Sequence, residues 1–245
     1  MTGAAVFISH SALGACATPA SDLGAAKWVV QCDFDGTISI DDVTDTLLTR
    51  FGRDGWPALE EAWEEGRIGS RECMKGQIAL LDMSEAELVT HLDGMAIDPH
   101  FAAFVQAARR LDITVQVVSD GLDRAITHIM NRAGLGDLPV FANRLVQTGE
   151  REWQLQSPYA DPHCQRASGN CKCARAAEQQ SLARKLLYIG DGSSDFCVSG
   201  RADLVLAKAS LIAHCRARGI NHRPFGDFSE ALELMLSVTA VAVVA

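Results

Sequence analysis

The chain has 245 residues, enough for one large α/β domain or for a core domain with a smaller insert. Hydrophobic residues make up 48% and charged residues 22%, which is ordinary for a globular protein. The formal net charge of −9 argues against a nucleic-acid-binding protein, which needs a basic face. No run of about 18 apolar residues occurs, so the sequence predicts no membrane span.

Residues 1–26 are expected to form a disordered leader. Residues 1–16 contain no Lys or Arg, whereas a secretory signal begins with positive charge, so secretion is not favoured. Most of the eight cysteines are scattered through a chain too long to depend on disulfides, which indicates a reducing compartment. We therefore expect a cytoplasmic protein.

The first predicted strand runs directly into acidic residues. Residues 27–33, KWVVQCD, form an apolar run with a polar end, which is typical of a buried parallel strand. From Asp33 the sequence reads DFDGTISIDD, with four aspartates in ten positions. Carboxylates so close together resist ionisation, so their position at a strand end indicates a specific chemical role.

Residues 42–96 show helix-like spacing and no strand signals, and we call them the cap segment. Glycines punctuate the segment, and Ser84 with Glu87 fits a capping box at a helix N-terminus. We expect a helical insert here, between two pieces of a core formed by residues 27–41 and 97–245.

Beyond the cap segment, helices and strands alternate. A helix is expected from residue 98, followed by the strand ITVQVVSDG at 113–121 and a helix that Gly134 closes. Short strands or a hairpin are expected over 138–156, before a loop rich in Pro, Cys and Gly over about 157–173.

The last third of the chain repeats this alternation. After a helix, LLYIGDGSSD at 186–195 predicts another strand that runs into acids, ADLVLAK at 202–208 predicts a further strand, and helices are expected to the end. The whole pattern predicts an α/β fold: a doubly wound, Rossmann-like parallel sheet with an inserted helical cap.

Three of the predicted strands end in chemically similar residues. In open α/β sheets the functional site lies outside the carboxyl ends of the strands. The strand ends should therefore bring together Asp33, Asp35, Ser119, Asp191 and Asp195.

So many carboxylates require a cation, and Mg²⁺ is the natural one because it binds through one or two carboxylates, water and a substrate phosphate. A calcium-binding EF-hand needs Gly at the sixth and Glu at the twelfth loop position. Counted from Asp33 those positions hold Ile38 and Thr44, and a count from Asp191 fails in the same way.

Mg²⁺ beside a free carboxylate suits the hydrolysis of phosphomonoesters. A carboxylate nucleophile can form an aspartyl-phosphate, while the metal neutralises charge so that one anion can attack another. A hydroxyl and a lysine would hold the phosphoryl oxygens. Ser119 supplies the hydroxyl and Lys172 the ammonium group, with Lys75 and Lys185 as alternatives.

Four motifs in order resemble those of the haloacid dehalogenase-like phosphatases. They are DFDGT at 33–37, VVSDG at 117–121, Lys172 and GDGSSD at 190–195. The resemblance extends over residues 27–236. It implies a doubly wound core, a cap that closes over the site, Mg²⁺ as cofactor and a small phosphorylated metabolite as substrate.

The resemblance also implies roles for single residues. Asp33 would be the nucleophile and a metal ligand, and Asp35 the general acid and base, with its backbone carbonyl on the metal. Asp191 would bind Mg²⁺, with Asp195 orienting that shell. The phosphate end of the substrate would meet Ser119, Asp120, Gly121 and Lys172.

The subfamily is similar to the phosphoserine phosphatases, which grip the substrate's amino-acid end with an acidic residue and a cap arginine. Asp42 matches the acid, but Gln77 stands where the arginine would be, and Arg67 and Arg71 are the remaining cap cations considered. A substrate carboxylate would lose its partner at Gln77. Residues 65–82 are more similar to the methionine-salvage branch, which dephosphorylates 2-hydroxy-3-keto-5-methylthiopentenyl-1-phosphate.

Other hypotheses stay open at this stage. Phosphoserine phosphatase is the main alternative. A phosphonatase or a mutase on the same scaffold is less favoured, and the phosphonatase would need a cap lysine, for which Lys75 is the one candidate. Outside enzymes, the same motifs fit a phospho-ligand or metal-binding protein without turnover. The sequence does not indicate an oligomeric state.

A second, structural metal is also considered. Zinc-ligand residue types gather at His163, Cys164, Cys171 and Cys173. Their spacing lacks the C-x₂-C knuckle of common zinc sites, and reduced loop cysteines are the simpler interpretation.

Overall fold

The structure is a computed structural model that describes Met1, residues 27–182 and residues 184–241. Residues 2–26 of the expected leader lie outside the described residues. One seven-stranded sheet has the order β4-β3-β2-β1-β5-β6-β7. Its strands are β1 (Trp28–Cys32), β2 (Thr114–Leu122), β3 (Val140–Gln147), β4 (Trp153–Gln156), β5 (Lys185–Gly190), β6 (Leu204–Ala207) and β7 (His222–Pro224).

Every neighbouring pair of strands is parallel except β3 and β4, which form an antiparallel hairpin at one edge. This confirms the predicted doubly wound parallel sheet and the predicted hairpin. The short edge strand β7 was not predicted. Its three residues have no apolar pattern, and the strand forms by pairing with β6.

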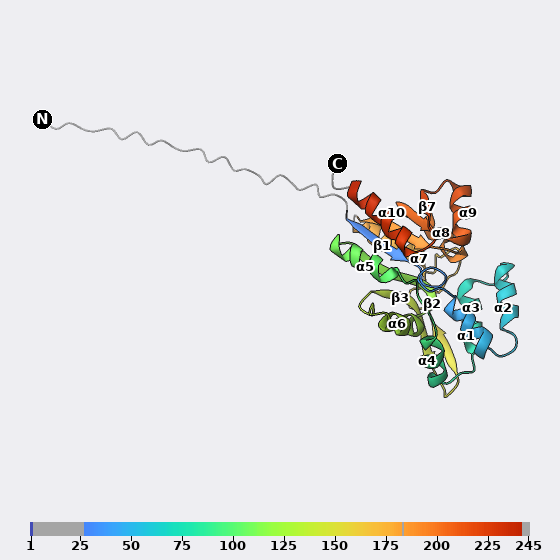
Figure 1. The fold of residues 1–245 in the computed structure, drawn as a ribbon. Helices are drawn as coiled ribbons and strands as arrows, with labels where there is room; N and C mark the ends of the chain where they lie inside the picture. The colour runs from blue at the N-terminus through green and yellow to red at the C-terminus, as the bar shows by residue number, and fades with distance from the viewer. Residues whose placement is uncertain (2–26, 183, 242–245) are drawn as a thin grey trace.

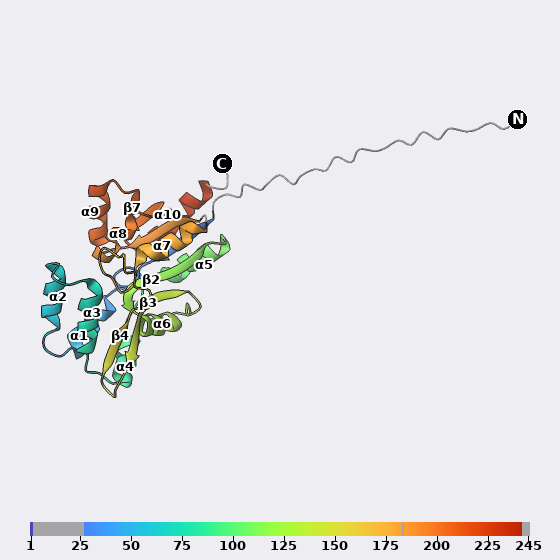
Figure 2. The same cartoon turned by 180° about the vertical axis from the view of Figure 1, so that it is seen from behind.

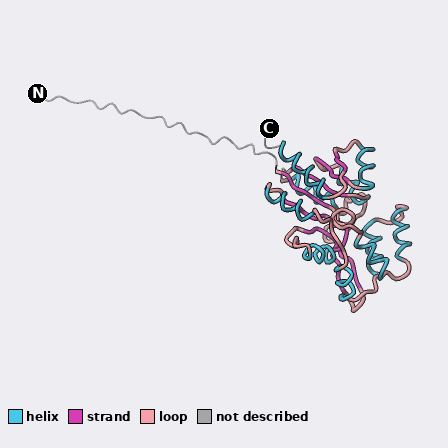
Figure 3. The backbone as a smooth tube through the Cα atoms, in the orientation of Figure 1, coloured by secondary structure: helices cyan, strands magenta, loops and turns pink. Residues whose placement is uncertain are grey.

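Helices cover both faces of the sheet and fill the cap segment (Figures 1 and 3). After the cap segment they are α5 (Phe101–Arg110), α6 (Asp123–Arg132), α7 (Lys172–Ser181), the 3₁₀ turn η1 (Ser193–Asp195), α8 (Phe196–Ser199), α9 (Ala209–Arg218) and α10 (Phe228–Val241). No helix in the described part of the chain is both long and apolar enough to cross a membrane.

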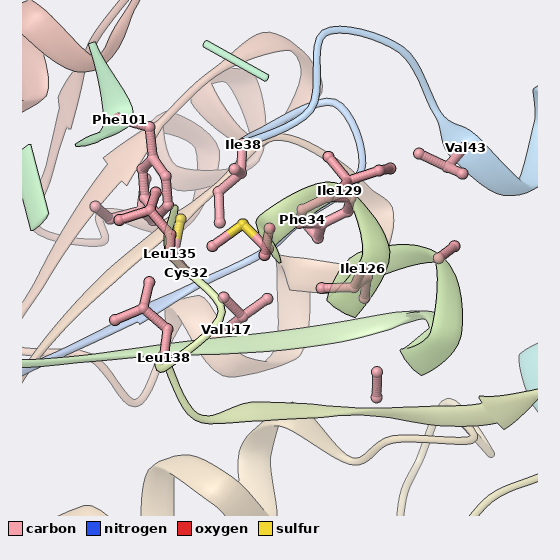
Figure 4. Close-up of a cluster of buried hydrophobic side chains, with 14 of the residues drawn as sticks. Cys32, Phe34, Ile38, Val43, Phe101, Val117, Ile126, Ile129, Leu135 and Leu138 are labelled. Atoms are coloured by element: carbon pink, nitrogen blue, oxygen red, sulfur yellow. The ribbon is translucent and has the colours of Figure 1, made fainter. Parts of the chain in front are cut away.

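Side chains alternate between the two faces of the central strands, as the two-residue period of a strand requires. On β1, Val30 and Cys32 join the main core, which α5, α6 and α10 cover, whereas Val29 packs on the opposite face beneath α7 and α8. Figure 4 shows part of the main core, where Cys32 and Phe34 lie among buried residues from α5 and α6. The strand that precedes the acidic residues is therefore anchored on both faces.

The cap segment contains α1 (Val43–Phe51), α2 (Trp56–Glu64), α3 (Ser70–Ala79) and α4 (Glu85–Asp93). Figures 1 and 2 agree that α1, α2 and α3 lie together at one end of the molecule, away from α5 and α10. Helix α4 contacts α6 instead. The predicted capping box at its start is confirmed, because Ser84 and Glu87 bond each other's backbone N–H groups.

Candidate active site

The carboxyl ends of β1, β2 and β5 open into one cavity of about 220 Å³ between the sheet and the cap segment. Most of the predicted site residues line it: Asp33, Asp35, Asp42, Gln77, Ser119, Asp120, Gly121 and Asp191. Lys172 lies directly behind Asp33 and contacts Asp195, and neither Lys172 nor Asp195 lines the cavity itself. The structure thus brings together ten residues from five separate parts of the chain.

Two glycines allow the strand ends to approach so closely. Gly36 has φ +68°, in the left-handed region that favours glycine, and a Cβ there would lie 2.8 Å from an oxygen of Asp191. A Cβ on Gly121 would lie 2.3 Å from Asp35 Oδ2. The glycines of DFDGT and VVSDG therefore keep the space in which the carboxylates meet.

Asp33 follows β1 and is 4% exposed. Its Oδ1 accepts the N–H of Phe34 at 2.8 Å, and its Oδ2 lies 2.6 Å from Lys172 Nζ. Burial raises the pKa of Asp33, and the charge of Lys172 opposes that rise. The carboxylate is thus fixed with its charge balanced by one buried ammonium group.

Lys172 is the first residue of α7 and is 2% exposed. Its Nζ lies 2.6 Å from both Asp33 and Asp195 and 2.9 Å from Ser194 Oγ. Burial alone would lower the pKa of Lys172, but Asp195 and Asp33 hold it above its ordinary value, so the side chain is charged. Lys75 and Lys185, the sequence alternatives, are exposed and line no part of this cavity.

Asp35 has a different electrostatic environment from Asp33. Its Oδ1 accepts the N–H of Val43 at the start of α1, and Ser119 Oγ donates to its Oδ2 at 3.5 Å. Burial, followed by the charge of Asp42, raises the pKa of Asp35 from 3.8 to about 8. A carboxyl that holds its proton near neutral pH is suited to act as a general acid.

Asp33, Asp191 and Asp195 each offer a carboxylate oxygen within 4.8 Å of the others. In the described residues no other such group of three His, Cys, Asp or Glu side chains occurs. Asp191 accepts a hydrogen bond from Thr37 Oγ1 at 2.8 Å, and burial, followed by the charge of Asp195, raises the pKa of Asp191. An all-oxygen set of this kind fits the preference of Mg²⁺.

Both carboxylate oxygens of Asp195 accept hydrogen bonds from other groups of the protein. Its Oδ1 accepts from Lys172 at 2.6 Å and from Tyr188 Oη at 2.5 Å, and its Oδ2 accepts the N–H groups of Asp191 and Gly192. Burial raises the pKa of Asp195, but Lys172 and these hydrogen bonds bring it below its ordinary value. This geometry favours an orienting role for Asp195 over direct metal ligation.

Several supporting residues were missed by sequence reasoning. Tyr188 and Ser194 hold Asp195 and Lys172, and the buried side chain of Asn170 bonds the carbonyls of Ser119 and Phe141. A tyrosine inside the aliphatic strand LLYIG was the one available signal, because a buried phenol needs a hydrogen-bond partner. Nothing in the local sequence marks Asn170.

Asp120, predicted to bind substrate, mainly ties three segments together. Its Oδ1 accepts from Asn170 N at 2.8 Å and from Ser168 Oγ at 3.3 Å, and its Oδ2 accepts from Ser70 Oγ at 3.4 Å. Ser70 begins α3 of the cap segment, and Asn170 precedes Lys172. Asp120 thus links the end of β2 to the cap segment and to the loop that carries the lysine.

At the cap end of the cavity, Gln77 is 3% exposed and donates from Nε2 to Glu60 Oε2 at 2.7 Å. Asp42 caps α1 by accepting the N–H of Asp45. Arg67 pairs with Glu65 at 2.5 Å, and Arg71 is exposed. Neither arginine lines this cavity.

The cysteine-rich loop does not form a compact ligand group. His163 is exposed, and all described cysteines are free thiols. The thiol of Cys173 lowers the pKa of Cys197, in α8, to about 6. Zinc binding by His163, Cys164, Cys171 and Cys173 stays a prediction.

A family model described as haloacid dehalogenase-like hydrolase matches residues 30–199. The chain belongs to this family. A 2-hydroxy-3-keto-5-methylthiopentenyl-1-phosphate phosphatase from Exiguobacterium sp. is 31% identical over 212 residues, which cover 85% of this chain and 97% of that protein. A protein of the same name from Geobacillus kaustophilus is 29% identical over 218 residues, which cover 84% of this chain and 94% of that one. The protein is thus an enzyme of this family, a phosphatase.

Solved structures support the same fold. A phosphoserine phosphatase solved as an analogue of its phospho-aspartyl intermediate superposes with a TM-score of 0.66 and 18% identity, over 85% of this chain and 99% of that one. A probable phosphoserine phosphatase from Vibrio cholerae superposes with a TM-score of 0.67 and 17% identity, over 89% and 66%. At these identities the likeness shows the fold alone.

The raised pKa values lead to a testable stability prediction. Without divalent metal, the free energy of unfolding should fall as pH rises from about 4 to about 8, by roughly 1.4 kcal/mol per pH unit for each proton that only the folded state retains. The reason is that Asp33, Asp35 and Asp191 keep protons to higher pH in the folded protein than in the unfolded chain. Asp195 has a lowered pKa, so the stability that its ionised form gives to the folded state is lost only as the pH falls below about 4.

Thermal unfolding across this pH range, in EDTA and in saturating Mg²⁺, measures the effect. Mg²⁺ binds ionised carboxylates, so it should raise the melting temperature most at the alkaline end and reduce the slope. Asp191→Asn should lessen both the slope in EDTA and the response to Mg²⁺. Equal slopes in EDTA and in Mg²⁺ would contradict metal binding at this group.

Proposed function

We propose that this enzyme hydrolyses the phosphomonoester bond of 2-hydroxy-3-keto-5-methylthiopentenyl-1-phosphate through an aspartyl-phosphate on Asp33. One observation carries the reaction type. A buried carboxylate, Asp33, is paired with Lys172 and lies beside a second carboxyl, Asp35, whose pKa is raised to about 8. The contact with Lys172 favours the ionised form of Asp33, whereas Asp35 has no ion pair among the described residues, so the two aspartates are suited to the roles of nucleophile and acid.

In the first half of the reaction, a carboxylate oxygen of Asp33 attacks phosphorus and the bond from phosphorus to the ester oxygen breaks. Asp35 gives its proton to the departing oxygen, so the leaving group departs as a neutral alcohol or enol. Lys172 Nζ lies 2.6 Å from Asp33 Oδ2. Its ammonium group can therefore stabilise the negative charge that develops on the phosphoryl oxygens. Ser119 Oγ lines the same cavity and can donate to one of those oxygens.

In the second half, Asp35 is ionised and takes a proton from water. The water oxygen attacks phosphorus, the acyl-phosphate bond to Asp33 breaks, and inorganic phosphate leaves. Asp35 recovers its proton and Asp33 its carboxylate, so the cycle closes without an external acid or base. The contact from Val43 N–H holds Asp35 in place for both transfers.

Mg²⁺ is the cofactor that we propose, held by the carboxylates of Asp33 and Asp191 and by the backbone carbonyl of Asp35. When bound, it neutralises negative charge shared between the phosphate and Asp33. Asp195 keeps Asp191 in place through its hydrogen bond to the Asp191 N–H at 2.9 Å. We propose the cytoplasm as the location, which the free cysteines support.

The substrate proposal depends on the named relatives and on the cap segment. Relatives at 26–31% identity that cover most of this chain carry the methylthiopentenyl-phosphate phosphatase name. Gln77 donates to Glu60 within the cavity, and the lining residues include no Lys or Arg that would pair with a substrate carboxylate. An uncharged leaving group is consistent with this lining.

The test is the specificity constant kcat/KM for this substrate and for phosphoserine, measured as phosphate release with Mg²⁺. We expect the methylthiopentenyl ester to be preferred by at least roughly 10-fold. EDTA should stop both reactions and added Mg²⁺ should restore them. A preference for phosphoserine would favour the second candidate, which the fold of the solved relatives and the position of Asp42 support.

A further inference from the structure

The cap end of the active-site cavity carries negative charge that the proposed chemistry does not use. Asp42, Asp45 and Glu60 line the cavity together with the half-buried Trp63. Desolvation and the charge of Asp45 raise the pKa of Asp42, while desolvation and the charge of Glu60 raise that of Asp45. All three carboxylates thus face one cavity, and Asp45 interacts with both Asp42 and Glu60.

No cation of the described chain offsets this charge. The residues that line the cavity include no Lys, Arg or His, and none of the three carboxylates is in an ion pair among the described residues. Lys172 is engaged with Asp33 and Asp195 at the opposite, phosphate end. Mg²⁺ would also bind at that end, so the cap end stays negative in the loaded enzyme.

Two of these acidic side chains, Glu60 and Asp42, are held in place by hydrogen bonds. Glu60 Oε2 accepts from Gln77 Nε2 at 2.7 Å, and Gln77 is almost fully buried. The Oδ1 of Asp42 accepts the N–H of Asp45 at the start of α1. Because both carboxylates are anchored on helices, they cannot easily turn away from a bound leaving group.

A second, independent feature indicates a ligand at the same place. Thr44 is 6% exposed, lines this cavity, and its Oγ1 has no hydrogen-bond partner among the described residues. A buried hydroxyl without a partner is costly, and a polar ligand group would satisfy it. Thr44 lies between Asp42 and Asp45 in the sequence, and all three residues line the cap end of the same cavity.

We propose that Asp45 and Glu60, together with Asp42, form an anionic specificity filter at the leaving-group end of the cavity. The filter excludes phosphomonoesters whose leaving group carries a carboxylate and admits those whose leaving group is uncharged or ends in an ammonium group. Repulsion between like charges that line one cavity is the physical basis, although Asp42 and Asp45 are exposed and Glu60 is half-buried. The inference rests on the proposed function only in taking this cavity as the place where the ester binds.

Three small esters of similar size test the filter: phosphoethanolamine, propyl phosphate and phosphoglycolate, with cationic, neutral and anionic leaving groups. For the wild type with Mg²⁺, kcat/KM should be lowest for phosphoglycolate, by roughly 10-fold or more relative to propyl phosphate. Glu60→Gln and Asp45→Asn should each narrow this gap. The amide oxygen introduced by Glu60→Gln could still accept the hydrogen bond from Gln77, so the change isolates charge.

Glu61→Gln is the matched control, because Glu61 is exposed on the same helix and does not line the cavity. It removes the same charge from α2 and should leave the ratio between the esters unchanged. A merely structural role for Glu60 would lower activity on all three esters alike and would leave their ratio as it was. High salt should also narrow the wild-type gap through screening.

Binding of the same esters to Asp33→Asn, measured by calorimetry with Mg²⁺, separates the filter from turnover. The same order of affinity, with weakest binding of phosphoglycolate, would support the filter even if the methylthiopentenyl ester is not the substrate. Equal binding and turnover of phosphoglycolate and propyl phosphate would overturn it. The filter would also be overturned if Glu60→Gln and Asp45→Asn left the ratio of kcat/KM between propyl phosphate and phosphoglycolate unchanged.

Discussion

Replacing Asp33 with asparagine should abolish phosphate release, with a loss on the order of 10⁴-fold or more in kcat. The amide has nearly the same shape as the carboxylate but cannot form the acyl-phosphate. The new amide oxygen could still accept the N–H of Phe34, and Lys172 would keep Asp195 as a partner at 2.6 Å. The folded structure should therefore persist, and the loss should be one of chemistry.

The measurement is phosphate release from a panel of phosphomonoesters, with and without Mg²⁺, for wild type and Asp33→Asn. Asp41→Asn is the control, because Asp41 belongs to the same acidic sequence but is exposed and does not line the cavity. It should retain wild-type activity. Mg²⁺-dependent release that survives in Asp33→Asn would remove the nucleophile assignment, and a wild type that binds esters without turnover would favour a sensing role.

Replacing Lys172 with methionine should impair both stability and activity. The ammonium group lies 2.6 Å from two carboxylates, Asp33 and Asp195, all three buried. Removing one partner of a buried ionic group leaves unpaired charge and typically costs about 3–5 kcal/mol of the free energy of unfolding. Activity should fall by roughly 10²–10³-fold or more, because a donor to the phosphoryl group is lost.

Denaturant unfolding and phosphate release measure these two effects. The lost stability should be partly recovered by acid, since protonation of Asp33 or Asp195 removes the unpaired charge, and partly by Mg²⁺. Lys75→Met is the matched control, because Lys75 is an exposed cap lysine outside the cavity. A Lys172→Met protein with normal activity would assign the phosphate-binding role to another cation.

Much of this fold could be predicted because its signals are local. A short apolar run is typical of a buried parallel strand, and β1 and β5 end where the apolar run meets acids and glycine. In β2 the pairing with β3 becomes irregular at the corresponding place, between Val118 and Leu122. The capping box of Ser84 and Glu87 depends on residues only three apart, so it could also be predicted from the sequence. By contrast, β7 has three residues and no apolar pattern, and its existence depends on its neighbour β6.

The candidate site divides in the same way. The convergence of Asp33, Ser119 and Asp191 followed from the rule that parallel strands end at one edge of a sheet. The hydrogen-bond partner of each side chain could not be predicted from the sequence. Tyr188 on Asp195, Asn170 on the Ser119 carbonyl and Ser70 on Asp120 join residues that only the folded chain makes neighbours.

Except for β7, the sequence by itself determined the order of the strands, the acidic strand ends and the glycines beside them, because these depend on short-range periodicity and residue size. Only the tertiary structure decided how each acid behaves. Asp33, Asp35 and Asp195 are the same residue type, yet burial raises the pKa of the first two, while Lys172 and backbone N–H groups lower that of the third. Desolvation and Coulomb interactions depend on distances in space, and those distances exist only once segments far apart in the chain have packed together.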